Sequence, residues 1–153
     1  MTPEFLTAQI LHIATHNLPE GHPEFSGLVF SRYDEAGKRR MGFLRAREIY
    51  NLSVPAELVV LSACGTGLGR DLRGEGPMGL TRAFLHAGAK RVVVSLWDVQ
   101  EKETATFMSR FYHGMLQQNL SPAAALRAAQ VWMAKEKYPP QAWAGFVLQG
   151  EPR

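Results

Sequence analysis

The sequence predicts an α/β fold with a mostly parallel β-sheet covered by helices. Three runs rich in β-branched and apolar residues, typical of buried strands, occupy residues 9–15, 58–63 and 91–97. A segment with helical periodicity separates the second run from the third, so residues 58–97 form a predicted strand–helix–strand unit. Such a unit normally joins two parallel strands through a right-handed crossover. With 46% hydrophobic residues, a chain of 153 residues is long enough for one compact domain.

The elements of the N-terminal part follow the first strand in short segments. Residues 28–30 form a second apolar run, and we expect a short strand there. The segment 32–43 carries a glycine-centred turn between polar residues, which is typical of a hairpin. Residues 45–52 form a short helix candidate.

The helix between the second and third buried runs is expected from residue 77 to residue 87. Pro77 suits the first turn of a helix, and Gly88 suits the position just after its end. The apolar stripe at helical spacing consists of Leu80, Ala83, Phe84 and Ala87.

Two further helices and a strand complete the predicted domain. The helices occupy residues 101–117 and 121–135, the second with Ser121 as N-cap and Pro122 in its first turn. The last strand spans residues 144–148. The two apolar stripes consist of Met108, Phe111, Tyr112 and Met115, and of Leu126, Ala129 and Met133.

Composition argues against several classes of function. The net charge of +3 is made by scattered basic residues, without the basic stripe and interleaved aromatics of a nucleic-acid binder. The apolar runs fall far short of the roughly 20 residues that span a membrane, and no signal sequence is apparent. A single cysteine fits a reducing compartment. We therefore expect a cytoplasmic protein with no nucleic-acid or membrane partner.

The strongest candidate site lies just beyond two of the predicted strands. His16 follows the strand at 9–15, and Cys64 follows the strand at 58–63. In open parallel sheets, sites form at the carboxyl ends of strands. If the two strands are neighbours, about 4.8 Å apart, a cysteine–histidine pair results, in which the imidazole activates the thiol for attack on a carbonyl group. The alternative from the residues alone is that Cys64 is a small apolar core residue.

The other histidines and the glycine-rich loop predict no further chemistry. His12 lies in the middle of its strand, where a buried and hydrogen-bonded core residue is expected. The remaining histidines lack companions at metal-ligand spacing, so no metal is predicted. Gly74, Gly76 and Gly79 spell G-x-G-x-x-G, but the pattern starts ten residues after the strand, so no nucleotide cofactor is expected.

Five motifs taken together resemble the CHAT-domain family of caspase-like cysteine peptidases. They are "ILHIATHN", "LVVLSACGTGLG", "RGEGPMGLTRAFLHAGAKRVVVSLWDV", "FMSRFY" and "WAGFVLQG", and they run in order from Ala8 to Gly150. The resemblance implies a caspase-like three-layer α/β/α sandwich. It also implies peptide-bond hydrolysis through a thioester acyl-enzyme, with His16 and Cys64 as catalytic residues. The backbone N–H groups of Asn17 and Cys64 would form the oxyanion hole.

The chain departs from the family pattern at two places. Asn17 stands where the family usually has glycine, which affects the predicted oxyanion hole. The segment "SLWDVQE" has Asp98 in place of a proline and Glu101 in place of the usual aspartate. We expect Trp97 and Asp98 to contribute to substrate binding, with Asp98 a candidate contact for a basic side chain.

The resemblance also bears on domain organisation and partners. We expect residues 1–153 to form one CHAT-like domain that lacks the N-terminal part usual in the family, which would leave the first strand at an edge of the sheet. The implied partners are a protein or peptide substrate, an upstream regulatory or repeat domain, and a second copy of the chain. The alternative to an enzyme is a catalytically inactive interaction or regulatory module with the same fold.

Overall fold

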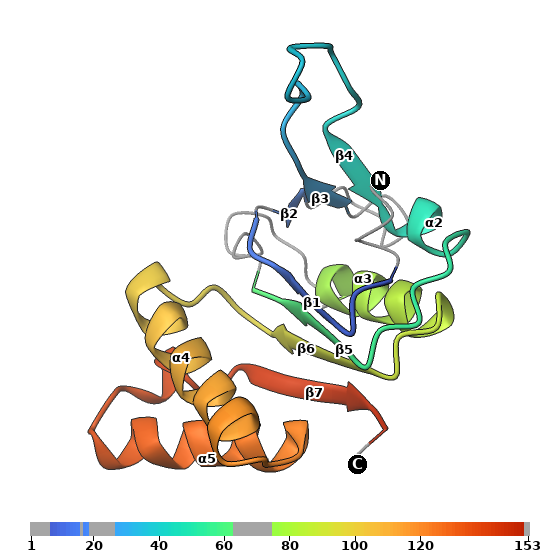
Figure 1. The fold of residues 1–153 in the computed structure, drawn as a ribbon. Coiled ribbons are helices and arrows are strands. Elements are labelled where there is room, and N and C mark those ends of the chain that lie inside the picture. The colour runs from blue at the N-terminus through green and yellow to red at the C-terminus, as the bar shows by residue number, and fades with distance from the viewer. Residues whose placement is uncertain (1–6, 16, 19–26, 63–74, 152–153) are drawn as a thin grey trace.

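The main sheet has four strands, of which three run parallel. A computed structural model describes residues 7–15, 17–18, 27–62 and 75–151 (Figure 1). The strands are β1 (Ile10–Ile13), β5 (Leu58–Leu61), β6 (Arg91–Ser95) and β7 (Phe146–Gly150), in the spatial order β1-β5-β6-β7. β5 pairs in parallel with both β1 and β6, whereas β7 runs antiparallel to β6. The predicted mostly parallel sheet is therefore confirmed.

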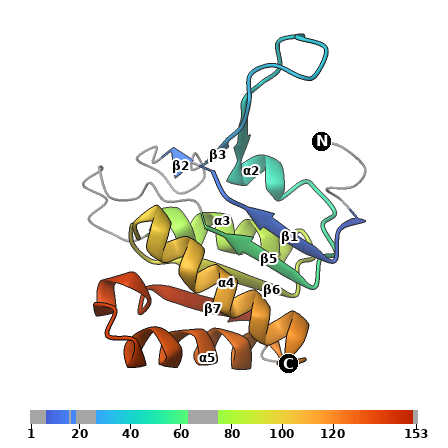
Figure 2. The ribbon, with the colours of Figure 1, turned by 60° about the vertical axis from the view of Figure 1, so that its left-hand side comes forward.

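Helices cover both faces of this sheet, so the predicted three layers are confirmed. The helices are α3 (Glu75–His86), α4 (Glu101–Gln117) and α5 (Pro122–Lys135). Figure 2 shows α3 on one side of the strands and α4 with α5 on the other. Because side chains alternate along a strand, β5 contributes to both cores: Val59 packs with the residues of α3, and Val60 with those of α4 and α5.

Strands from the N-terminal part of the chain form a second, antiparallel sheet. It contains β2 (Asn17–Leu18), β3 (Gly27–Val29) and β4 (Phe43–Arg45) in that order, and the short helix α2 (Ala46–Ile49) follows β4. The predicted hairpin is confirmed: β3 and β4 pair, and a bridge joins Tyr33 to Arg39 in the arm that projects in Figure 1. The sequence did not predict that β2 joins them.

The ends of the helices follow the predicted signals. Ser121 Oγ accepts a hydrogen bond from the backbone N–H of Ala124, and Pro122 occupies the first turn of α5. Gly88 has a φ of 110°, a left-handed conformation that glycine adopts without a Cβ penalty. The last strand begins at Phe146, two residues later than predicted, and a 3₁₀ turn at Pro140–Ala142 precedes it in the chain.

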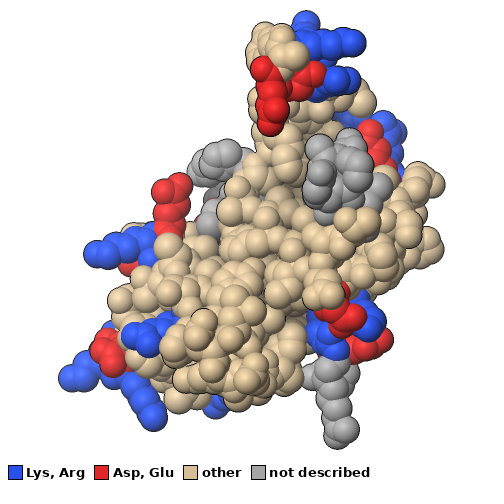
Figure 3. Space-filling model, viewed as in Figure 1, with Lys and Arg blue, Asp and Glu red and all other residues tan. Residues whose placement is uncertain are grey.

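Charges of both signs are mixed on the surface. Acidic and basic side chains lie side by side at the margin of the face drawn in Figure 3, including the tip of the hairpin. The described residues of this face therefore form no basic stripe of the kind that follows a nucleic acid backbone. Within the described part of the chain, no helix combines the length and the apolar character needed to cross a membrane.

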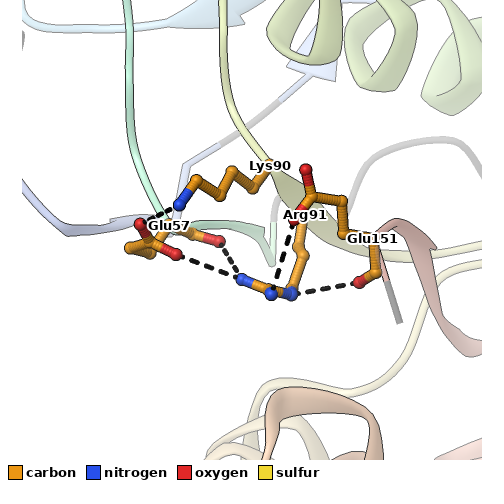
Figure 4. Close-up of polar contacts among 4 residues, drawn as sticks. All are labelled: Glu57, Lys90, Arg91 and Glu151. Carbon is orange, nitrogen blue, oxygen red and sulfur yellow. Dashed lines mark hydrogen bonds and ion pairs between the residues drawn. The ribbon is translucent and has the colours of Figure 1, made fainter. Parts of the chain in front are cut away.

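An ionic cluster joins the strands at the end of the sheet opposite to the carboxyl ends of β1 and β5. Arg91 is only 7% exposed, and its guanidinium donates to the backbone carbonyls of Glu57 and Glu151 (Figure 4). The Glu57 carboxylate accepts from Lys90 and also pairs with Arg91 at 3.3 Å. The hydrogen bond from Lys90 is the main reason that the pKa of Glu57 lies below its usual value of 4.5.

Replacing Glu57 with glutamine should weaken the pH dependence of folding in acid. Since the pKa of Glu57 is lower in the folded chain, the unfolded chain takes up the proton first as the pH falls below about 4.5. The stabilisation is present above that pH and is lost below it. Urea unfolding between pH 3 and pH 7 should show a shallower acid slope in Glu57→Gln than in the control Glu35→Gln on the exposed hairpin; equal slopes would contradict this role.

Candidate active site

The predicted catalytic residues come just after β1 and β5 in the chain, beyond the carboxyl ends of these two strands. The two strands are parallel neighbours, with His12 opposite Val60 and Ile13 opposite Leu61. β1 ends three residues before His16, and β5 ends three residues before Cys64. His16 and Cys64 themselves lie outside the described residues. The structure therefore describes the two strands that precede these residues.

The chain on either side of His16 is connected to the second sheet. The hydroxyl of Thr15 donates a hydrogen bond to the backbone carbonyl of Val29 in β3. Asn17, the first residue of β2, pairs antiparallel with Leu28, also in β3. The backbone of Asn17 thus lies in a strand that begins directly after His16. The other predicted oxyanion-hole residue, Cys64, is outside the described part of the chain.

Trp97 and Asp98, the predicted substrate-binding residues, follow β6. The indole N–H of Trp97 donates to the backbone carbonyl of Gln141 at 2.8 Å. The ring lies over Gly145 so closely that a Cβ added there would be 2.6 Å from it. Trp97 therefore anchors the connection that leads into β7, although it is 39% exposed. Asp98 is exposed.

His12 differs from the prediction, because it is hydrogen-bonded but only partly buried. Its Nε2 lies 2.8 Å from Ser62 Oγ, and its Nδ1 lies 3.0 Å from the hydroxyl oxygen of Tyr112. The prediction of burial was wrong because β1 is at the edge of the four-stranded sheet, where its side chains are covered only in part. The three hydrogen-bonded side chains connect β1, the end of β5 and α4.

A cavity of about 400 Å³ opens between this edge of the sheet and α4. Among the described residues, its lining consists of His12, Ala14, Thr15 and Ser62 on the sheet side, and of Glu101, Thr104, Ala105 and Met108 on α4. Thr15 directly precedes His16, and Ser62 comes two residues before Cys64. The cavity thus lies beside Thr15 and Ser62, the described residues that come shortly before the predicted catalytic residues in the chain. Neither Trp97 nor Asp98 is among its described lining residues.

His12 and its hydrogen-bond partner Tyr112 are both uncharged at neutral pH. Burial lowers the pKa of His12 below its usual value of 6.5, so the imidazole is neutral. Burial also raises the pKa of Tyr112 to about 12, so the phenol keeps its proton. Among the described lining residues, Glu101 is the only carboxylic acid, and none is lysine or arginine. The part of the chain that the structure describes contains no cluster of side chains suited to a metal ion.

Sequence reasoning missed Ser62 and Tyr112 as residues of this region, and it noted Glu101 only as a departure from the family pattern. Ser62 could have been found by alternation, because residues two apart along an extended segment share a face. Tyr112 was assigned to the apolar stripe of its helix, which is correct as far as it goes: its ring contacts Phe111 and it packs against the core. Its hydroxyl reaches a strand 100 residues away in sequence, and no local pattern predicts that.

Comparison with known proteins adds two findings. A family model described as "CHAT domain" matches residues 4–151. "Tetratricopeptide repeat protein 28" of Homo sapiens is 36% identical over 108 residues, which are 70% of this chain and 4% of the relative's length. The protein of the same name from Mus musculus has the same identity and coverage. The matched segment is therefore a small part of these long relatives.

Proposed function

Because this chain belongs to the CHAT domain family, as its five motifs predicted, we propose that it is a caspase-like cysteine endopeptidase with Cys64 as nucleophile and His16 as general base. The observation that supports this most is the pairing of β1 with β5. Two neighbouring parallel strands end at the same edge, and each is followed after the same number of residues by one member of the pair.

The proposed reaction proceeds in two steps. The imidazole of His16 takes the proton of the Cys64 thiol, and the thiolate attacks the carbonyl carbon of the scissile peptide bond. Backbone N–H groups of Asn17 and Cys64 donate to the oxyanion that develops on the carbonyl oxygen. His16 then gives its proton to the leaving amine, and a thioester remains on Cys64. A water molecule, deprotonated by His16, hydrolyses the thioester and regenerates the thiol.

A protein substrate and a repeat domain are the partners that we propose. The relatives from human and mouse are named for tetratricopeptide repeats, and the matched segment is only 4% of their length. Such repeats build extended concave surfaces that bind other proteins. A repeat domain connected to this chain, or bound to it, would then present the substrate to the proposed site.

An active-site-directed label tests the proposal. Peptidyl acyloxymethyl ketones are expected to form a covalent adduct on Cys64, detected by mass spectrometry. The adduct should form much faster than the same reagent reacts with free cysteine in solution. His16→Ala should abolish this acceleration, and the control His113→Ala, on the exposed side of α4, should retain it. Labelling at the rate of free cysteine in all three proteins would contradict the peptidase proposal and favour the inactive module.

A further inference from the structure

The hairpin arm, residues 30–42, projects from the second sheet and carries exposed apolar side chains (Figure 1). Met41 is 78% exposed, the highest value among the large apolar side chains that the structure describes, and Tyr33 is 61% exposed. Tyrosine, methionine and arginine are the residue types that protein interfaces use more often than the rest of the surface does. The composition of the arm is therefore that of a docking surface.

Tyr33 and Met41 lie on one face of the arm. A bridge places Tyr33 opposite Arg39, and Met41 follows Arg39 by two residues. Since residues two apart along an extended segment share a face, all three side chains point to the same side. Arg32 lies on the other face, where it crosses Gly42: a Cβ added to this glycine would be 2.8 Å from Arg32 Cγ. The first face thus combines two apolar side chains with a cation.

Hydrogen bonds at the tip hold the arm in one shape. The Asp34 carboxylate accepts from the backbone N–H groups of Ala36 and Lys38. Its second oxygen accepts from Arg40 Nε at 2.8 Å. Gly37 has a φ of 74°, a conformation in which glycine has no Cβ penalty. A surface that is already ordered loses less conformational freedom on binding than a flexible one.

The arm has an excess of positive charge. Its four basic residues and two acidic residues give a formal net charge of +2. Asp34 forms an ion pair with Arg40. Lys38 and Arg39 belong to none of the ion pairs among the described residues. Both are exposed, so their charges are accessible to a partner.

We propose that this face of the arm docks on an acidic surface of another protein. Tyr33 and Met41 supply the apolar contact, and Lys38 and Arg39 face carboxylates of the partner. A second copy of the chain fits less well, because a symmetric contact between two arms would bring like charges together. A nucleic acid also fits less well, because Glu35 lies close in sequence to these two cations. The proposal does not depend on the peptidase function.

Binding of a defined acidic peptide tests the proposal. The probe is a short peptide rich in glutamate and phenylalanine, and the comparison peptide has glutamine in place of each glutamate. NMR titration of the purified protein should show the acidic peptide binding about tenfold more tightly, with the largest shift changes on the arm. Equal affinities for the two peptides, or tighter binding of a uridine oligonucleotide, would overturn the proposal.

Substitutions on the arm locate the binding surface. Tyr33→Thr and Met41→Thr should each weaken binding of the acidic peptide by about fivefold or more, and Arg39→Gln should reduce the preference for glutamate. The controls Leu116→Gln and Arg127→Gln, exposed on α4 and α5, should leave binding within about twofold of the wild type. Because all five side chains are exposed, the variants are expected to fold. Unchanged binding in the three arm variants would overturn the proposal.

Sedimentation of the purified protein tests the second copy as the alternative occupant. A monomer, or an oligomer that Tyr33→Thr does not affect, supports an acidic partner for the arm. A dimer that Tyr33→Thr dissociates would assign this face to a second copy and overturn the proposal. Neither result bears on the reactivity of Cys64, so failure of the arm and failure of the peptidase function are distinguishable.

Discussion

Replacing His16 with alanine is expected to lower kcat/KM for peptide hydrolysis by at least about a thousandfold. General-base catalysis by a positioned histidine contributes about 10²–10⁴-fold, and a thiol without its base is only a few per cent ionised at neutral pH. Nucleophile and base act as a unit, so Cys64→Ala should remove activity to a similar extent, and the double variant should lose little more. A fluorogenic peptide assay at pH 7 measures all three.

His113→Ala provides the matched control for this result. His113 lies on α4, is exposed, and is not one of the described residues lining the cavity. Its replacement should leave kcat/KM within about twofold of the wild type, because a surface substitution away from the site changes neither folding nor chemistry. A loss below tenfold in His16→Ala would contradict its role as the base.

Replacing Phe107 with alanine is expected to lower the free energy of unfolding by about 3–5 kcal/mol. Phe107 of α4 is fully buried, and its ring stacks on that of Phe146 in β7 with 4.1 Å between the centroids. Truncation removes apolar contact area and leaves a cavity that the neighbouring side chains cannot fill. Since domains of this kind are stable by only about 5–15 kcal/mol, much of the stability would be lost.

Urea unfolding of Phe107→Ala and Leu116→Ala, both in α4, separates the effect of lost burial from any effect of alanine on helix propensity. Leu116 lies in the same helix but is 61% exposed, so Leu116→Ala should change the free energy of unfolding by no more than about 0.5 kcal/mol. Equal losses in Phe107→Ala and Leu116→Ala would show that the core on this face of the sheet is not packed as described.

The longer elements were predictable because their patterns are local. The helix at 101–117 was predicted with its bounds, and the strands at 58 and 91 with their start, since helical stripes and continuous apolar runs are visible in the sequence itself. Phe107 was nevertheless missed as a core residue: the apolar stripe on that helix is wider than the four residues assigned to it.

What depends on neighbours could not be predicted in the same way. β2 has two residues, too few for a pattern of alternation, and it exists only because β3 pairs with it. His12 occupies a run that looks buried on both faces, yet it is partly exposed; the resemblance indicated an edge position for the first strand, but the apolar run itself does not show it. The cavity forms because Glu101 and Thr104 lie close to His12 and Thr15, which come about 90 residues earlier in the chain. The sequence of neither segment predicts this proximity.

The most direct test of the central claim, that Cys64 and His16 act as a pair, is the pH dependence of alkylation of Cys64 by iodoacetamide. An ordinary thiol has a pKa of about 8.5, and its rate falls about tenfold for each pH unit below that value. We expect the wild type to keep a high rate below pH 7, and His16→Ala to react like an ordinary thiol. Identical profiles in the two proteins, both following an ordinary thiol, would contradict the account.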